Sequence, residues 1–185
     1  FELERLLDCE EVDFDLIKCN DRWCLNIASV GLDARIGADV SNYKRLPFLH
    51  GFKAYAASTV VNVVKGIAEH YVVEVNGECI DGRQTLICAC NGRFYGGGML
   101  PCPSQTRKDD KVSFCIFHGS GKLNTLMIFP SLFKGEHIKY EKNVNIHAGY
   151  DISVTFDRPA SVQIDGETIL GVTEYKVKAK VPAVI

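Results

Sequence analysis

From Tyr71 onward the chain is mostly a succession of short strand-like segments separated by turn dipeptides. Asn76-Gly77, Asp81-Gly82 and Asp165-Gly166 each favour a tight turn between paired strands. Short strands at this density are typical of a β-sandwich, and they argue against a doubly wound parallel sheet. Alternating or continuous apolar residues predict strands at residues 71–75, 84–91, 111–117, 144–148, 151–156, 160–164 and 175–180.

The first part of the chain adds two strands and one clear helix. Strands are predicted at residues 12–19 and 23–29, with the turn residues Asn20-Asp21 between them. A looser region is predicted after Gly31-Leu32-Asp33, as far as Pro47. Apolar residues at i, i+3 and i+4 spacing then predict an amphipathic helix at 52–67.

A second helix is predicted at residues 123–133, where Pro130 would kink or split it. The predicted fold is therefore mainly β with one or two helices, an α+β domain built on a β-sandwich. With 185 residues the chain is long enough to bury a core, and residues 1–185 are interpreted as a single domain.

Charge and hydropathy exclude some partners. The net charge of -2 gives no overall attraction to nucleic acid or to anionic lipid, so no nucleic-acid partner is expected. Local basic patches remain, for instance around Lys134, Lys139 and Lys142. No apolar run reaches the ~20 residues that a membrane-spanning helix needs.

The eight cysteines contain no C-x-x-C pair, so their spacing does not predict a zinc site. Cys88 and Cys90 lie two residues apart in an apolar run, which on a strand places both on one face. Buried, reduced thiols of a cytosolic protein are the preferred interpretation.

Asp165-Gly166-Glu167 has two interpretations. Asp-Gly between two strand segments is a strong signal for a hairpin turn. Two carboxylates at a strand end also suit general base chemistry, in which one abstracts a proton and the other orients it or binds magnesium. The two interpretations are compatible, because a tight turn on a rigid sheet holds its side chains in place.

Two loops carry further candidate residues. Glycines 96–98 would let the backbone approach another surface closely, and Asn91 before them is a candidate to line a cleft. The Asp109-Asp110 pair is either a solvated loop or a site for a hard cation, although its basic neighbours oppose a cation. Asn26 and Asp33 are interpreted as capping and turn residues.

Four segments in order give the chain a resemblance to a known family. They are residues 26–34 (NIASVGLDA), Asn91 with Gly96-Gly97-Gly98-Met99, residues 103–110 (PSQTRKDD) and residues 163–167 (QIDGE). This arrangement resembles the diacylglycerol kinase catalytic family, which includes bacterial diacylglycerol kinases, sphingosine kinases and ceramide kinase. Residues 134–137 (KGEH) before a strand also fit the pattern.

The resemblance implies the β-sandwich C-terminal domain of the NAD kinase/diacylglycerol kinase-like fold. In this family an N-terminal domain binds ATP, and that domain is expected to be absent from this chain, so the fragment alone is expected to be inactive. The whole protein is expected to be a cytoplasmic lipid kinase that uses ATP and Mg²⁺ and contacts the inner membrane face peripherally. A homodimer is compatible with exposed strand edges.

The resemblance also implies roles for individual residues. Asp165 matches the base that acts on the lipid hydroxyl, and Glu167 matches the acidic residue beside it. Asp109 and Asp110 fall in a loop that holds a structural magnesium ion in some bacterial members, with Asp110 in place of a glycine and Ser113 in place of an aspartate. The residues near the lipid slot are Asn91, Gly96, Gly97, Gly98 and Met99.

Two alternatives remain at this point. The same fold occurs in NAD kinase, so a phosphotransferase acting on a soluble acceptor would share these features but would need a polar cleft. A non-enzymatic β-sandwich that binds a lipid would share the fold without the chemistry.

Overall fold

Nine strands form one continuous sheet in which every pairing is antiparallel. The computed structural model describes residues 13–44, 52–96, 98–106 and 111–184. The strands are β1 (Asp13–Cys19), β2 (Arg22–Cys24), β3 (Ile27–Gly31), β4 (Glu69–Val75), β5 (Glu78–Cys90), β6 (Val112–His118), β7 (Val144–Gly149), β8 (Ile152–Ile164) and β9 (Glu167–Val184).

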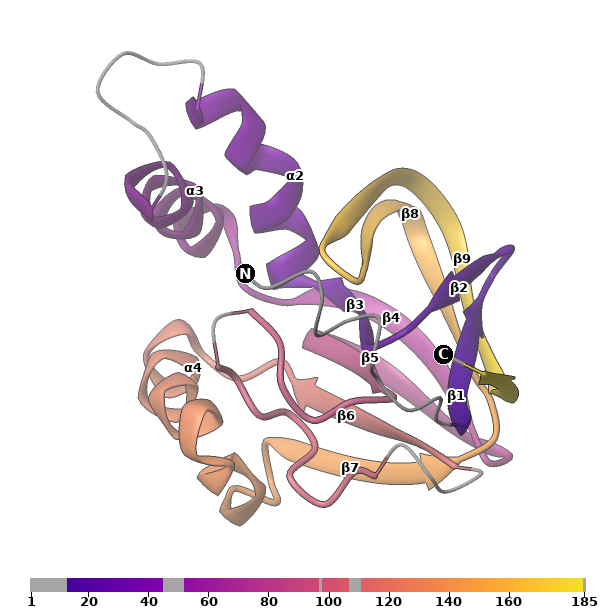
Figure 1. Cartoon of the computed structure of the whole chain (residues 1–185). Coiled ribbons are helices and arrows are strands. Elements are labelled where there is room, and N and C mark those ends of the chain that lie inside the picture. Colours follow the sequence, from indigo (N-terminus) through magenta and orange to yellow (C-terminus); the bar gives the residue numbers. More distant parts are fainter. Residues whose placement is uncertain (1–12, 45–51, 97, 107–110, 185) are drawn as a thin grey trace, which may run out of the picture.

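The helices gather on one side of the molecule (Figure 1). They are α2 (Leu32–Lys44), α3 (Phe52–Lys65) and α4 (Lys122–Ile128), with the 3-10 turns η1 (Phe129–Lys134) and η2 (Glu136–Lys139) after α4. The split at the Ile128/Phe129 boundary confirms the predicted effect of Pro130, which is the second residue of η1. None of the described helices is long and apolar enough to cross a membrane.

The sheet folds back on itself because two long strands change partners along their length. Its order is β2-β1-β9-β8-β3-β5-β6-β7, and β4 pairs with both β5 and β8. The first part of β5 pairs with β4, and its second part lies between β3 and β6. Register shifts in β5 and β8 mark the bends. The predicted mainly β, sandwich-like fold class is confirmed.

Two apolar cores lie on opposite faces of β5. Ile87 and Ala89 of this strand belong to the main core inside the folded sheet. The alternate residues Leu86, Cys88 and Cys90 belong to a second core, which α4 and η1 cover. The prediction that Cys88 and Cys90 share one face is therefore confirmed.

Helix α2 (Leu32–Lys44) occupies most of the region predicted to be loose, so that prediction is wrong from residue 34 to Lys44. Several contacts of α2 with α3 are polar. The Ser58 hydroxyl donates to the carbonyl of Ile36 at 2.9 Å, and the Asn62 amide donates to the Asp39 carboxylate at 3.0 Å. Because polar groups mediate this packing, the segment lacks the continuous apolar stripe that identifies a helix from sequence.

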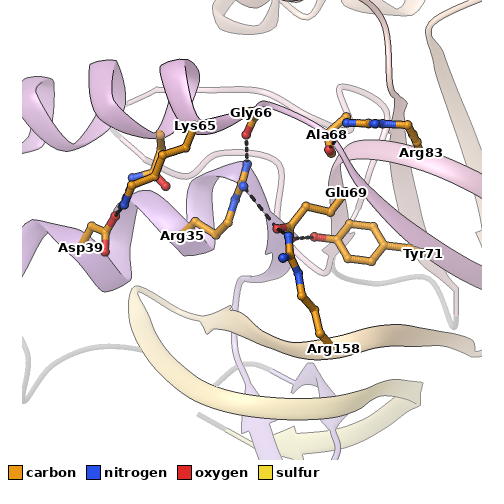
Figure 2. A network of polar contacts seen from close by, with 10 residues as sticks. Arg35, Asp39, Lys65, Gly66, Ala68, Glu69, Tyr71, Arg83 and Arg158 are labelled. Carbon is orange, nitrogen blue, oxygen red and sulfur yellow. Dashed lines mark hydrogen bonds and ion pairs between the residues drawn. The ribbon is translucent and has the colours of Figure 1, made fainter.

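Ion pairs fasten α2 to the sheet (Figure 2). The Arg35 guanidinium on α2 donates to the carbonyl of Gly66, beyond α3, at 2.6 Å and lies 3.4 Å from Glu69 Oε1 at the start of β4. Arg158 of β8 contacts the same carboxylate oxygen at 2.8 Å, while the Tyr71 hydroxyl donates to Oε2 at 2.9 Å. One glutamate thus joins a helix to two strands.

Thiol reactivity tests the two-core arrangement. Of the seven described cysteines, six are buried and Cys79 is exposed, which confirms the predicted burial except at Cys79. Burial also raises the pKa of the Cys88 thiol well above its usual value, which disfavours the reactive thiolate. We expect an aromatic disulfide reagent to label Cys79 rapidly in the native protein and the other six only after unfolding. Rapid native labelling in a Cys79→Ser variant, mapped to Cys88 by mass spectrometry, would contradict the packing.

Candidate functional site

The Asp165 carboxylate binds the backbone that connects β2 to β3. Asp165 lies at the turn between β8 and β9 with φ of 48°, and Ile164 pairs with Glu167 across that turn. Its Oδ1 accepts hydrogen bonds from the N–H groups of Asn26 at 2.9 Å and Ile27 at 3.1 Å. Its Oδ2 accepts one from the N–H of Leu25 at 2.6 Å. The hairpin turn predicted for Asp165-Gly166 is confirmed.

This binding explains why the strand predicted at 23–29 is broken. β2 ends at Cys24 and β3 begins at Ile27, and the backbone between them turns toward the Asp165 carboxylate. The Cys24 thiol also donates to Oδ1 at 3.3 Å. Its pKa is raised by the neighbouring Cys19 thiol, by burial and by the charge of Asp165, so Cys24 stays protonated and remains a donor.

Glu167 points to a different partner. Its carboxylate lies 3.6 Å from the Arg22 guanidinium of β2, and both side chains are largely exposed. An exposed ion pair of this kind contributes little to stability. The two carboxylates predicted to act together therefore make separate contacts in the described residues.

Asn26 connects the Asp165 turn to the glycine-rich loop. Its N–H donates to Asp165, and its side-chain amide donates to the carbonyl of Phe94 at 2.8 Å. Its own carbonyl accepts hydrogen bonds from the N–H groups of Asn91 at 2.9 Å and Gly92 at 2.8 Å. A residue interpreted from sequence as a cap is thus the junction of the three predicted site segments.

Asn91 lies behind this junction and is fully buried. Its side-chain amide donates to the carbonyls of Asp15 at 2.6 Å and Leu25 at 2.8 Å, while Oδ1 has no hydrogen-bond partner among the described residues. The structure therefore places Asn91 as a tie between β1 and the β2–β3 connection.

The glycine-rich loop is a small hairpin closed by Tyr95 and Met99. The Met99 N–H donates to the Tyr95 carbonyl at 2.9 Å, and the Tyr95 N–H donates to the Met99 carbonyl at 3.0 Å. Gly96 has φ of 54°, and a Cβ there would overlap the methyl of Met99. The loop therefore brings Met99 inward, where it is buried in the second core. Gly98 also has positive φ, and Gly97 lies outside the described residues.

An apolar cavity of about 150 Å³ lies between the helices and the outer face of β5 and β6. Helix α2 contributes Leu32 and Ile36, α3 contributes Val63, and Ile67 of the connection from α3 to β4 also lines the cavity. The side chains of Tyr95 and Met99 from the glycine-rich loop also line it, together with Phe117 of β6 and Ile128, Phe129 and Leu132 from α4 and η1. Among the predicted lipid-slot residues that the structure describes, Met99 is the one that lies in this wall.

One acidic residue lies in the cavity wall. The Asp33 carboxyl accepts hydrogen bonds from the Ser29 hydroxyl at 2.5 Å and from the N–H of Ala34 at 2.7 Å. The Tyr95 hydroxyl also donates a hydrogen bond to it. Desolvation raises the pKa of Asp33 despite these bonds. The buried Thr85 hydroxyl, also in the wall, has no hydrogen-bond partner among the described residues. Sequence analysis did not place Asp33 here, because it did not predict α2.

The predicted metal site lies outside the described residues, since Asp109 and Asp110 belong to the segment 107–110. In the described ranges, no group of three or more His, Cys, Asp or Glu side chains is arranged to hold a metal ion. Within the described part of the chain, the carboxylates of Asp165 and Glu167 accordingly do not form a ligand set with a third residue.

The strand-rich, folded-back sheet with its helix-covered cavity defines a β-sandwich-like domain. Residues 26–184 match the family described as the YegS C-terminal NAD kinase beta sandwich-like domain, and the chain belongs to this family. This agrees with the resemblance to the diacylglycerol kinase family that the four sequence segments indicated.

Relatives and solved structures support the same assignment. Proteins named "Putative lipid kinase" from Staphylococcus aureus strains Newman and Mu3 are each 25% identical over 167 residues, covering 90% of this chain and 54% of the relative. The chain thus spans about half the length of these relatives. A crystal structure of a diacylglycerol kinase from Bacillus anthracis strain Sterne aligns over 91% of this chain and 52% of its own, with 14% identity and a TM-score of 0.57. At that identity the likeness shows the fold.

Proposed function

We propose that this chain is the lipid-binding part of an ATP-dependent lipid kinase, which transfers the γ-phosphate of ATP to a lipid hydroxyl. The observation that carries the proposal is the apolar cavity between α2, α3 and α4 in a domain of this family. A soluble acceptor such as a nucleotide needs a polar cleft, whereas an acyl chain fits apolar walls. The cavity lining therefore favours a lipid substrate.

Asp165 is the proposed general base. Its Oδ1 already accepts two N–H groups and a thiol, but Oδ2 accepts one N–H, so Oδ2 retains a lone pair for the substrate hydroxyl. The N–H donors fix the orientation of the carboxylate, so it needs no reorganisation before taking the proton. Glu167 is the proposed second acidic group at the same turn.

ATP and its accompanying Mg²⁺ are proposed to bind chiefly to the part of the protein that this chain does not span. When bound, Mg²⁺ would neutralise charge that develops on the transferred phosphoryl group. The residues of this chain would hold the acyl chain, orient the hydroxyl and accept its proton. The Asn26 contacts place the glycine-rich loop, which helps to line the cavity, next to the Asp165 turn.

The test is phosphorylation of a lipid panel by the full-length protein that contains this chain, with a variant that fills the cavity. Val63 of α3 lines the cavity, whereas Val60 of the same helix is exposed and does not. We expect Val63→Trp to lower phosphorylation of long-chain diacylglycerol by at least about tenfold, because excluding two methylenes costs about 0.8 kcal/mol each.

Val60→Trp is the matched control and should retain wild-type activity. A short-chain diacylglycerol should be less sensitive to Val63→Trp than the long-chain form. The assignment of the cavity to the acyl chain would be contradicted if Val63→Trp and Val60→Trp lost equal activity. It would also be contradicted if Val63→Trp lost equal activity on long-chain and short-chain diacylglycerol. Transfer to a soluble acceptor with no transfer to any lipid would overturn the proposed function itself.

A further inference from the structure

The segment from α4 to η1 is apolar on its outer face as well as on its inner face. Ile128 and Leu132 point inward and are buried in the second core. Five large apolar side chains on the same segment are between 43% and 74% exposed, and together they are called the α4 surface: Leu123, Leu126, Met127, Phe129 and Phe133. A helical segment that is apolar all round is normally covered on every side.

The α4 surface adjoins the apolar cavity. Leu126 and Phe129 line the cavity and are also exposed, so the cavity reaches solvent within this surface. The rings of Phe129 and Phe133 meet edge to face, with centroids 5.9 Å apart. Figure 1 shows α4 on the side of the molecule away from the β1–β9 pair.

The charged residues within the segment from α4 to η1 are lysines, although the chain carries a net charge of -2. Residues 122–134 contain no Asp or Glu and have a lysine at each end, Lys122 and Lys134. Helix α3 also has no acidic residue and ends at Lys65. The Lys122 ammonium donates to the carbonyl of Val64 at 2.8 Å, which joins the start of α4 to the end of α3.

We propose that the α4 surface docks the protein on an anionic lipid bilayer, with its apolar side chains inserted at the headgroup level. Exposed Leu, Met and Phe side chains flanked by lysines are the combination that interfacial segments use on such membranes. The proposal rests on the proposed function, because a cavity mouth inside the inserted surface lets a lipid enter without crossing water. The lysines favour a bilayer over a second copy of this chain, whose same surface would carry the same charge.

The test measures vesicle binding by the full-length protein without ATP, so it does not depend on kinase activity. Leu123 and Met127 are exposed and do not line the cavity, which leaves the lipid-binding wall intact in a Leu123→Glu/Met127→Glu variant. The matched control is Leu170→Glu, an equally exposed leucine on β9. Co-sedimentation uses vesicles of phosphatidylcholine with phosphatidylglycerol, and vesicles of phosphatidylcholine alone.

We expect the wild type and Leu170→Glu to bind the anionic vesicles, more weakly at high salt, and the double variant to bind them at least about tenfold more weakly. Unchanged melting temperatures would confirm that all three are folded. Equal vesicle binding by the double variant would overturn the proposal. So would a change from dimer to monomer on ultracentrifugation with vesicle binding intact, because the surface would then join two copies.

Phosphorylation of detergent-dispersed diacylglycerol separates this inference from the proposed function. The double variant should keep wild-type activity on dispersed lipid and lose activity on lipid in vesicles. Loss of both activities in a folded variant would count against a docking role. Vesicle binding that depends on the α4 surface, in a protein with no lipid kinase activity, would leave docking standing and overturn the proposed function.

Discussion

Replacing Asp165 with asparagine is expected to lower both the activity and the stability of the protein. The amide can place its oxygen toward the N–H groups of Asn26 and Ile27, but its NH₂ group then faces the N–H of Leu25 and leaves that donor unpaired. The free energy of unfolding should fall by about 1–3 kcal/mol. Loss of the general base should lower phosphorylation by about 10²–10⁴-fold.

Activity per folded molecule separates the two effects, with the folded fraction taken from chemical denaturation at the assay temperature. Asparagine tolerates the positive φ of position 165, so the variant does not add backbone strain. Glu167→Gln is the matched control at the same turn, and its loss of an exposed ion pair should change the unfolding free energy by less than about 1 kcal/mol. Full activity in folded Asp165→Asn would leave Asp165 with a structural role alone.

Gly31→Ala is expected to be the most destabilising single methyl addition in the described sheet. Gly31 ends β3 with φ of 115°, and a Cβ there would overlap the carbonyl oxygen of Thr85 and approach Leu86 Cα to 3.1 Å. The backbone conformation costs about 1–3 kcal/mol for a residue with a side chain. Displacing β5 adds about 1–3 kcal/mol. The sum is a large fraction of the ~5–15 kcal/mol that stabilises a typical domain.

Two other glycines separate the components of this effect. Gly77 has φ of 80° and open space where its Cβ would lie, so Gly77→Ala should show the conformational cost without the overlap. Gly121 has open space and no positive φ, so Gly121→Ala should be close to neutral. Denaturant titration should show the largest loss of unfolding free energy for Gly31→Ala, a smaller loss for Gly77→Ala and the smallest for Gly121→Ala. If Gly31→Ala lowered the unfolding free energy no more than Gly77→Ala, β5 would be able to shift away from the added methyl group with little loss of stability.

The strands were predictable because their information is local. Alternation along β4 and β7, the apolar run of β6 and the Asn-Gly and Asp-Gly turns can each be recognised within a few residues. Helix α2 was not predictable in this way, because Asp39 and the backbone of Ile36 meet polar partners on α3 and no apolar stripe is needed. A periodicity argument detects only helices that pack through apolar side chains.

The candidate site was predictable in its residues and not in its contacts. The turn at Asp165 follows from two neighbouring residues, but its binding to Leu25, Asn26 and Ile27 depends on the pairing of β3 with β8. Asp33 came into the cavity wall only through α2, which the sequence pattern did not indicate. Local sequence therefore identified the chemistry-bearing groups, while tertiary packing decided which of them meet.

The pairing of β1 with β9 has a consequence for how the domain forms. These are the first and last described strands, and Cys19 pairs with Val177 across nearly the whole chain. The bond from Leu25 to Asp165 likewise joins residues 140 positions apart. Contacts of such long range are slow to form, because the loop-closure entropy must be overcome before they stabilise anything. During synthesis the Asp165 junction can therefore assemble only after the ribosome has released β8 and the turn that follows it.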